Sequence, residues 1–197
     1  MTSIFMKEWM AGGRSPFFLP ISTVCNCNCL FCSNKYNSFD SLYGLFRDVE
    51  DIKHQLSLMP IHAQPIDLSC ILPGRLPEGE AFLHPRFFEI LTIIRKKFPL
   101  NRLTFFSNGL ILDRAFMEML SRFRPVTIAL SIHTLEPDIW ARIYNKSISE
   151  AERALKACDL INEYGLSLKG SVVPVPELCG WDGIERVVSF LQAHQAD

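Results

Sequence analysis

Four cysteines crowded into eight positions constrain this chain more than any other feature. Cys25, Cys27, Cys29 and Cys32 lie in one short loop, and three of them have the spacing C-x3-C-x2-C. Three thiolates so placed can hold three irons of a [4Fe–4S] cube and leave the fourth iron open to another ligand. The spacing therefore predicts an iron–sulfur centre with Cys25, Cys29 and Cys32 as its metal ligands.

Zinc is the main alternative to iron in this loop. Structural zinc takes four ligands in tetrahedral geometry, and Cys27 would supply the fourth. The run C-x-C-x-C-x2-C is a poor match to the paired knuckles of such sites. The second hypothesis is thus a zinc or iron–sulfur module that has no further cofactor chemistry. The remaining cysteines, Cys70, Cys158 and Cys179, are scattered, and we expect them to behave as small buried apolar residues.

Composition narrows the class of protein further. The chain has 197 residues, 48% of them hydrophobic, which suits one domain with a sizeable core. No apolar run approaches the roughly 18 residues of a membrane span. Charged residues interrupt positions 1–20, so a signal-peptide core is not expected and we predict a cytoplasmic protein. A net charge of −1 gives no general attraction for nucleic acid or for a membrane.

Apolar spacing predicts strands and helices in alternation along the chain. The predicted strands cover 17–24, 65–72, 102–106, 126–132 and 166–173, and the predicted helices cover 40–59, 85–97, 113–123, 147–164 and 182–194. Parallel neighbours need crossover helices, so this order indicates an α/β fold with a parallel sheet. The chain ends with the fifth helix and lacks a sixth strand, as a piece of a longer protein would.

Polar segments follow four of the predicted strands. They are the cysteine loop, Glu78-Gly79-Glu80, Ser107-Asn108-Gly109, and Ser131 to His133. Ligands of α/β folds bind at the carboxyl ends of their strands, and parallel strands bring these ends to one edge. We therefore expect the four segments to surround one site.

The cysteine loop resembles that of the radical S-adenosylmethionine (radical SAM) superfamily, whose pattern is C-x3-C-x-aromatic-C. Phe31 fills the aromatic position before Cys32. The segment from Glu78 resembles the family's Gly-Gly-Glu-Pro loop, although Glu78 replaces the first Gly and Ala81 replaces the Pro. The resemblance implies that Glu80 accepts the ammonium group of S-adenosylmethionine and that Gly79 lets the backbone approach it closely. A solvated loop carboxylate is the other interpretation of Glu80.

Two further segments resemble family motifs more weakly. Ser107-Asn108-Gly109 is similar to the Thr-Asn-Gly found after strand three, although Asn-Gly is also a common turn. Residues 170–177 resemble the motif G-x-I-x-G-x-x-E, with Val172 in the Ile position and Pro174 in place of the second Gly. The resemblance implies contacts of Ser107 and Asn108 with the cofactor and an apolar wall from Val172 against its adenine. Plain strand core is the other interpretation of Val172.

The fourth strand and the segment after it contribute three more candidates. The resemblance implies that Ser131 hydrogen-bonds the ribose or the methionine carboxylate of the cofactor. Arg142 would pair with that carboxylate through its guanidinium, or would simply be an exposed helix residue. His133 is expected to be a local hydrogen-bonding residue rather than a catalyst.

The resemblance spans residues 19–194 and implies a fold, cofactors and an activity. The fold is a partial parallel (βα)6-type barrel with about five βα units in this chain, all 1–197 forming one core domain. The cofactors are a [4Fe–4S] cluster and S-adenosyl-L-methionine, which is reductively cleaved to a 5′-deoxyadenosyl radical that abstracts hydrogen from a substrate. The resemblance leaves the substrate unknown: a peptide, a cofactor precursor and a small molecule that undergoes rearrangement are the alternatives. The implied partner is a low-potential electron donor of the flavodoxin or ferredoxin type. A third hypothesis is a degenerate barrel that only binds a partner.

Overall fold

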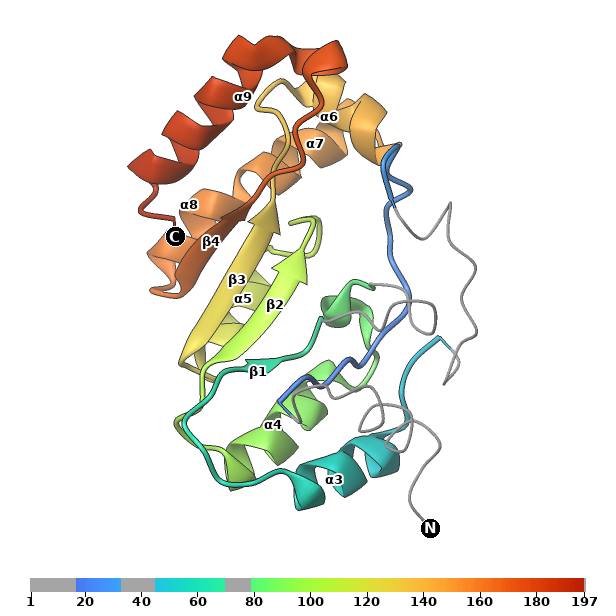
Figure 1. Cartoon of the computed structure of the whole chain (residues 1–197), viewed down its shortest axis with the longest axis vertical. Helices are drawn as coiled ribbons and strands as arrows, with labels where there is room; N and C mark the ends of the chain where they lie inside the picture. The colour runs from blue at the N-terminus through green and yellow to red at the C-terminus, as the bar shows by residue number, and fades with distance from the viewer. Residues whose placement is uncertain (1–16, 33–44, 70–78, 197) are drawn as a thin grey trace. The chain divides into compact units, whose positions relative to one another are not determined.

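The computed structural model describes residues 17–32, 45–69 and 79–196, and the chain divides into two compact units (Figure 1). The first unit is Met1–Asn26 with Cys32–Phe105, and the second is Cys27–Phe31 with Phe106–Asp197. Cys70 and Glu78 lie outside the described residues. Among the described residues, no helix is long and apolar enough to cross a membrane.

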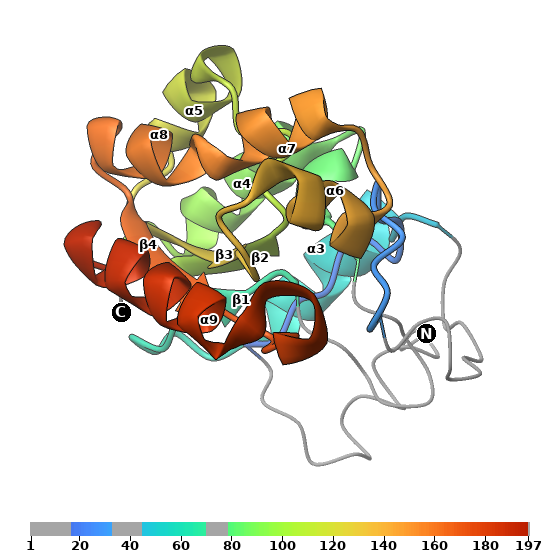
Figure 2. The ribbon, with the colours of Figure 1, turned by 90° about the horizontal axis from the view of Figure 1, so that it is seen from above.

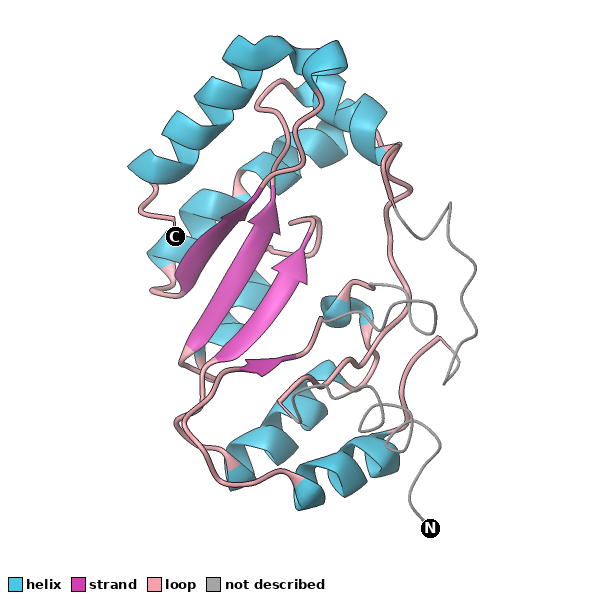
Figure 3. Ribbon diagram, viewed as in Figure 1, coloured by secondary structure: helices cyan, strands magenta, loops and turns pink. Residues whose placement is uncertain are grey.

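The sheet has four strands, drawn in magenta in Figure 3. They are β1 (Ile66–Asp67), β2 (Leu103–Ser107), β3 (Val126–Ser131) and β4 (Ser167–Ser171), in the order β1-β2-β3-β4. Both β1 with β2 and β3 with β4 pair in parallel. Because β1 and β4 are the edge strands, the sheet is open. The predicted parallel α/β architecture, a barrel that does not close, is confirmed.

The first predicted strand, 17–24, is wrong as a continuous strand. Phe18 makes a parallel bridge to Asp67, whereas Ser22 makes an antiparallel bridge to Phe46. Pro20 separates the two bridges, and proline has no N–H to donate to a strand ladder. The segment before the cysteines therefore changes partner midway and is held at two points.

The first helix of unit 1 begins later than predicted. Helix α3 (Val49–Leu58) starts after Asp48, whose side chain accepts a hydrogen bond from the Glu50 N–H at 2.7 Å. Leu45 and Phe46 precede the helix, and Leu45 is 68% exposed. The predicted helix is therefore wrong over residues 45–48, since an N-cap aspartate fixes the start of α3, and its predicted start at Asp40 lies outside the described residues.

A second helix of unit 1 packs on the first. A short 3-10 turn, η1 (Ala81–Leu83), leads to α4 (Phe87–Lys97), which buries Ile90, Leu91 and Ile94. At its end, the Lys97 ammonium donates to the carbonyl oxygens of Leu56 at 2.5 Å and Met59 at 2.8 Å. Lys97 thus donates to carbonyls at the C-terminal end of α3, where a helix leaves carbonyl oxygens available.

The described residues of unit 2 form five helices. They are α5 (Arg114–Ser121), α6 (Pro137–Tyr144), α7 (Ile148–Leu155), α8 (Ala157–Glu163) and α9 (Pro176–Ala193). The capping box predicted at Ser147 and Glu150 is present and begins α7. The single helix predicted over 147–164 is instead two helices that meet at Lys156. Helix α9 lies beside β4 in both Figure 1 and Figure 2. The two elements approach so closely that a Cβ on Gly170 would lie 2.7 Å from Leu191 Cδ1.

Two helix boundaries in unit 2 differ from the sequence-based expectation. Helix α6 was not predicted, although Pro137 stands at its first turn, a favoured place for proline. Helix α9 begins at Pro176 rather than at Asp182, and Gly180 (φ 66°, ψ 168°) interrupts it. The predicted start coincides with the part of α9 that follows this left-handed glycine.

Candidate functional site

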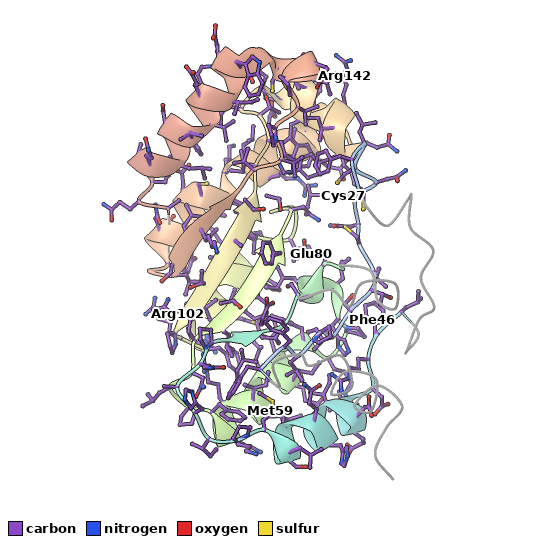
Figure 4. All side chains as sticks on the ribbon, viewed as in Figure 1. Cys27, Phe46, Met59, Glu80, Arg102 and Arg142 are labelled. Atoms are coloured by element: carbon purple, nitrogen blue, oxygen red, sulfur yellow. The ribbon has the colours of Figure 1, made fainter. Side chains whose placement is uncertain are left out.

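The backbone that leads into Cys25 is held by the segment Gly79-Glu80 of the same unit. A Cβ on Gly79 would lie 2.4 Å from the Ser22 carbonyl oxygen, so only glycine fits at this position. The next amide, that of Glu80, donates to the Val24 carbonyl at 2.7 Å. Glu80, labelled in Figure 4, is only 3% exposed. The structure thus brings Gly79 and Glu80 against the residues immediately before Cys25, and the role of Glu80 toward the cofactor stays a prediction.

The part of the cysteine loop from Cys27 to Phe31 belongs to unit 2 and contacts the end of α6. The Asn28 N–H donates to the Tyr144 carbonyl at 3.1 Å, and the Leu30 N–H donates to the Ile143 carbonyl at 2.9 Å. Carbonyls in the last turn of a helix have no partner within it, so they are available to a neighbouring loop. Cys27 and Cys29 pack against the buried cluster that includes Ile143 and Tyr144.

An aromatic column connects this loop to the interior of unit 2. The rings of Phe31 and His133 meet edge to face at 4.7 Å between centroids, and His133 stacks on Tyr144 at 5.3 Å. Tyr144 in turn stacks on Trp140 at 4.0 Å, and the Trp140 side chain is fully buried. Edge-to-face and stacked pairs at these separations are favourable beyond the apolar area that they bury.

His133 is buried and uncharged at neutral pH. Its side chain is 2% exposed, and burial lowers its pKa to about 4. Its Nδ1 atom accepts a hydrogen bond from the Val173 N–H at 3.0 Å. A neutral imidazole that accepts at Nδ1 carries its proton on Nε2, which fixes the tautomer.

Ser107 and Asn108 are both buried at the end of β2. The Ser107 hydroxyl oxygen accepts from the Gly109 N–H at 3.1 Å, and the Asn108 amide oxygen accepts from the Leu110 N–H at 3.0 Å. Gly109 has φ 84°, a conformation that favours glycine. Both side chains therefore build the turn, and their contacts with a cofactor stay a prediction.

The other predicted cofactor residues of unit 2 have different degrees of burial. Ser131 ends β3 and is half-buried, and its carbonyl accepts from the Tyr144 hydroxyl at 2.5 Å. Val172 follows β4 directly and is half-buried as well. Arg142 is exposed on α6 (Figure 4). Their roles toward a cofactor are predictions that rest on the family resemblance.

The cysteine side chains themselves suit a cluster by their chemistry and accessibility. Cys25 is exposed, and Cys29 and Cys32 are half-buried, so each sulfur is in reach of an incoming ion. Fe–S clusters are held by cysteine thiolates, and the assignment of these three residues as the ligands of an open-iron cube stays a prediction. Within residues 17–32, 45–69 and 79–196, no three His, Cys, Asp or Glu side chains already form a metal-binding group.

Two cysteines outside the loop have other surroundings. Cys158 is fully buried on α8, and burial, with a smaller contribution from Asp159, raises the pKa of its thiol to about 12. It is the small buried apolar residue that the sequence predicted. Cys179 is half-buried on α9, where its sulfur contacts the Val175 carbonyl oxygen at 3.2 Å.

Comparison with known proteins agrees with this geometry. The family model of the radical SAM superfamily matches residues 19–183, so the chain belongs to the radical SAM superfamily, a family of enzymes. Among curated proteins, it is 24% identical to the FeMo cofactor biosynthesis protein NifB of Methanocaldococcus infernus, over 88% of this chain and 62% of NifB.

Solved structures show the same fold at low sequence identity. Streptococcus suis SuiB bound to S-adenosylmethionine matches with a TM-score of 0.63 and 16% identity, over 98% of this chain and 40% of SuiB. Methylornithine synthase (PylB) matches with a TM-score of 0.60 and 18% identity, over 91% of this chain and 50% of PylB. The chain thus spans between two fifths and two thirds of the relatives named here.

Sequence reasoning missed the contribution of α6. It assigned no role to Trp140 or Tyr144, and it gave His133 only a local one. The available signal was Pro137 followed by Asp138, a proline and an acidic residue in a first helical turn.

Proposed function

We propose that this chain carries the S-adenosylmethionine-cleaving core of a radical SAM enzyme. The observation that carries the proposal is the close packing of Gly79-Glu80 on the backbone before Cys25, next to a C-x3-C-x2-C loop. A bound and reduced [4Fe–4S] cluster would supply the one electron needed to cleave S-adenosylmethionine at its sulfonium into methionine and a 5′-deoxyadenosyl radical. Cys25, Cys29 and Cys32 would hold that cluster.

The protein's part is binding, orientation and exclusion of water. Glu80 is buried and carries a carboxylate, so we assign it the ammonium group of the methionine part. Val172 supplies an apolar wall for adenine, and Ser131, Ser107 and Asn108 supply polar atoms for ribose and carboxylate. Arg142 is a second donor to the carboxylate.

The substrate and the electron donor are proposed more broadly. SuiB has been solved with its precursor peptide SuiA, and NifB is a FeMo cofactor biosynthesis protein. We propose that the substrate here is likewise a peptide or a cofactor precursor that yields a hydrogen atom to the radical. A small low-potential donor of the flavodoxin or ferredoxin type would supply the electron.

The test compares two cysteines of the same loop. Cys27 and Cys29 are both half-buried and pack against the same cluster, but only Cys29 is assigned as a ligand. After anaerobic reconstitution and reduction with dithionite, we expect wild type and Cys27→Ala to release 5′-deoxyadenosine from S-adenosylmethionine. Cys29→Ala should release none. Product formation by Cys29→Ala, or a colourless wild-type protein that contains zinc, would contradict the proposal.

A further inference from the structure

A side-chain hydrogen bond extends the contact between β3 and β4 beyond their last backbone pair. Backbone pairing runs to Ser131 opposite Ser171, and the Ile132 N–H then donates to the Ser171 carbonyl at 3.1 Å. Two residues after Ser171, the Val173 N–H donates to His133 Nδ1 rather than to a carbonyl. The imidazole therefore fixes the chain at the point where it leaves the sheet.

The same imidazole contacts the cysteine loop on another side. The Phe31 ring meets it edge to face, at 85° between the ring planes, one residue before the assigned ligand Cys32. Tyr144 stacks nearly parallel to it, at 10°, and is itself anchored to the Ser131 carbonyl through its hydroxyl. His133 thus contacts both the Phe31 ring and the backbone of Val173.

We propose that His133 is a positioning residue for S-adenosylmethionine, which holds the cysteine loop at Phe31 and the adenine-side segment Val172-Val173 in one fixed arrangement. This inference rests on the proposed function and adds a residue to it. A hydrogen-bond acceptor and a flat ring are both required at this position. Histidine as a neutral Nε2-H tautomer offers both.

The two requirements can be separated by substitution. His133→Phe keeps a flat ring but removes the acceptor of the Val173 N–H. His133→Asn places an amide oxygen near the former Nδ1 position but removes the ring. A merely space-filling role for His133 would favour the Phe variant, because it conserves volume and stacking.

The first measurement needs no cofactor. In the cluster-free protein, we expect hydrogen exchange of the Val173 amide to be about tenfold faster in His133→Phe than in wild type, because this amide loses the Nδ1 atom to which it donates. In His133→Asn it should stay within about threefold of wild type. Equal exchange rates in wild type and His133→Phe would overturn the inference.

The second measurement uses the reconstituted enzyme and follows 5′-deoxyadenosine. For His133→Phe we expect the KM for S-adenosylmethionine to rise about tenfold, with kcat and iron content within about twofold of wild type. For His133→Asn, we expect the increase in the logarithm of KM to be at most half of the increase seen for His133→Phe. An unchanged KM in His133→Phe would overturn the inference. So would a rise in KM that is accompanied, in both variants, by equal losses of kcat and iron content.

Wild-type protein alone provides a further check, in case a variant fails to fold. Hydrogen exchange of the peptides that cover 28–31 and 171–175 should slow together on addition of S-adenosylmethionine. Slowing in only one of them would contradict a shared anchor. If wild type itself releases no 5′-deoxyadenosine, the proposed function fails, whereas the exchange measurement on Val173 still decides the role of His133.

Discussion

The backbone before the cysteine loop and the middle of the loop are held by different kinds of contact. Before Cys25, the chain of unit 1 is held by backbone against backbone, with Gly79 too close to Ser22 for any Cβ. From Cys27 to Phe31, the chain of unit 2 is held by rings and by the carbonyls at the end of α6. A backbone anchor thus depends on one residue type at one position, whereas a ring column distributes its support over several side chains. Substitutions in the two regions should therefore have different effects.

Removing the base of the ring column should have the largest effect. Trp140 is fully buried and stacks on Tyr144, so Trp140→Ala is expected to cost about 4 kcal/mol of unfolding free energy. Urea denaturation measures this loss. Trp181→Ala is the matched control, because Trp181 is 66% exposed and its removal should cost less than about 0.5 kcal/mol. Similar losses for both variants would show that the column does not support unit 2.

Adding one methyl group to the backbone anchor should come next. Gly79→Ala places a Cβ about where the Ser22 carbonyl already stands, and we expect a loss of about 3 kcal/mol. Gly180→Ala is the control: its Cβ would meet no atom within 4 Å, and its backbone conformation (φ 66°, ψ 168°) alone should cost about 2 kcal/mol. Thermal and urea unfolding compare the two. A milder effect at Gly79 than at Gly180 would contradict the backbone anchor.

Acid should weaken the ring column but leave the backbone anchor unaffected. Burial lowers the pKa of His133 to about 4 from an ordinary 6.5, so folding favours its neutral form. The stability it contributes is complete above pH 6.5 and is lost as the pH falls toward 4. Between pH 7 and pH 5 we expect its share of the loss to be about 2 kcal/mol. Urea midpoints for wild type and His133→Asn should converge over this range, and parallel profiles would contradict the prediction.

The smallest effect is expected from a single hydroxyl. Tyr144→Phe keeps both ring contacts of the column and removes the hydrogen bond to the Ser131 carbonyl. The expected cost is about 1 kcal/mol, as for one neutral hydrogen bond. Near-UV circular dichroism should retain the Trp140–Tyr144 signal. A loss as large as that of Trp140→Ala would mean that the hydroxyl, and not the stacking, supports the column.

The alternation of strands and helices was predictable because it depends on local pattern. Apolar spacing predicted β2, β3 and β4 together with α4, and the capping box at Ser147 predicted the start of α7. The first strand and the first helix were less well predicted, since Pro20 and Asp48 act through individual hydrogen bonds that an apolar pattern does not contain. Helix α6 was missed because Ile139, Trp140, Ile143 and Tyr144 are β-branched or aromatic, and such residues are common in strands as well.

Candidate site residues could be predicted where they lie close together in the sequence. The spacing of Cys25, Cys29 and Cys32 and the aromatic position of Phe31 are visible without a structure. The fit of Gly79 against Ser22 joins residues far apart in the chain, and no pattern in the sequence predicted it. The bond from Val173 to His133 had no sequence signal, because it depends on how two strands diverge at their ends.

The engagement of the Asn28 and Leu30 amides by α6 has an electronic consequence. N–H groups that point at cluster sulfurs stabilise added negative charge and so make a cluster easier to reduce. Here both amides already donate to the Tyr144 and Ile143 carbonyls. A cluster held in this loop would lack these two donors and would keep a more negative reduction potential, which makes it a stronger one-electron donor to a sulfonium. Loosening α6 with Trp140→Ala should then raise the midpoint potential in a redox titration monitored by electron paramagnetic resonance, and an unchanged potential would exclude this tuning.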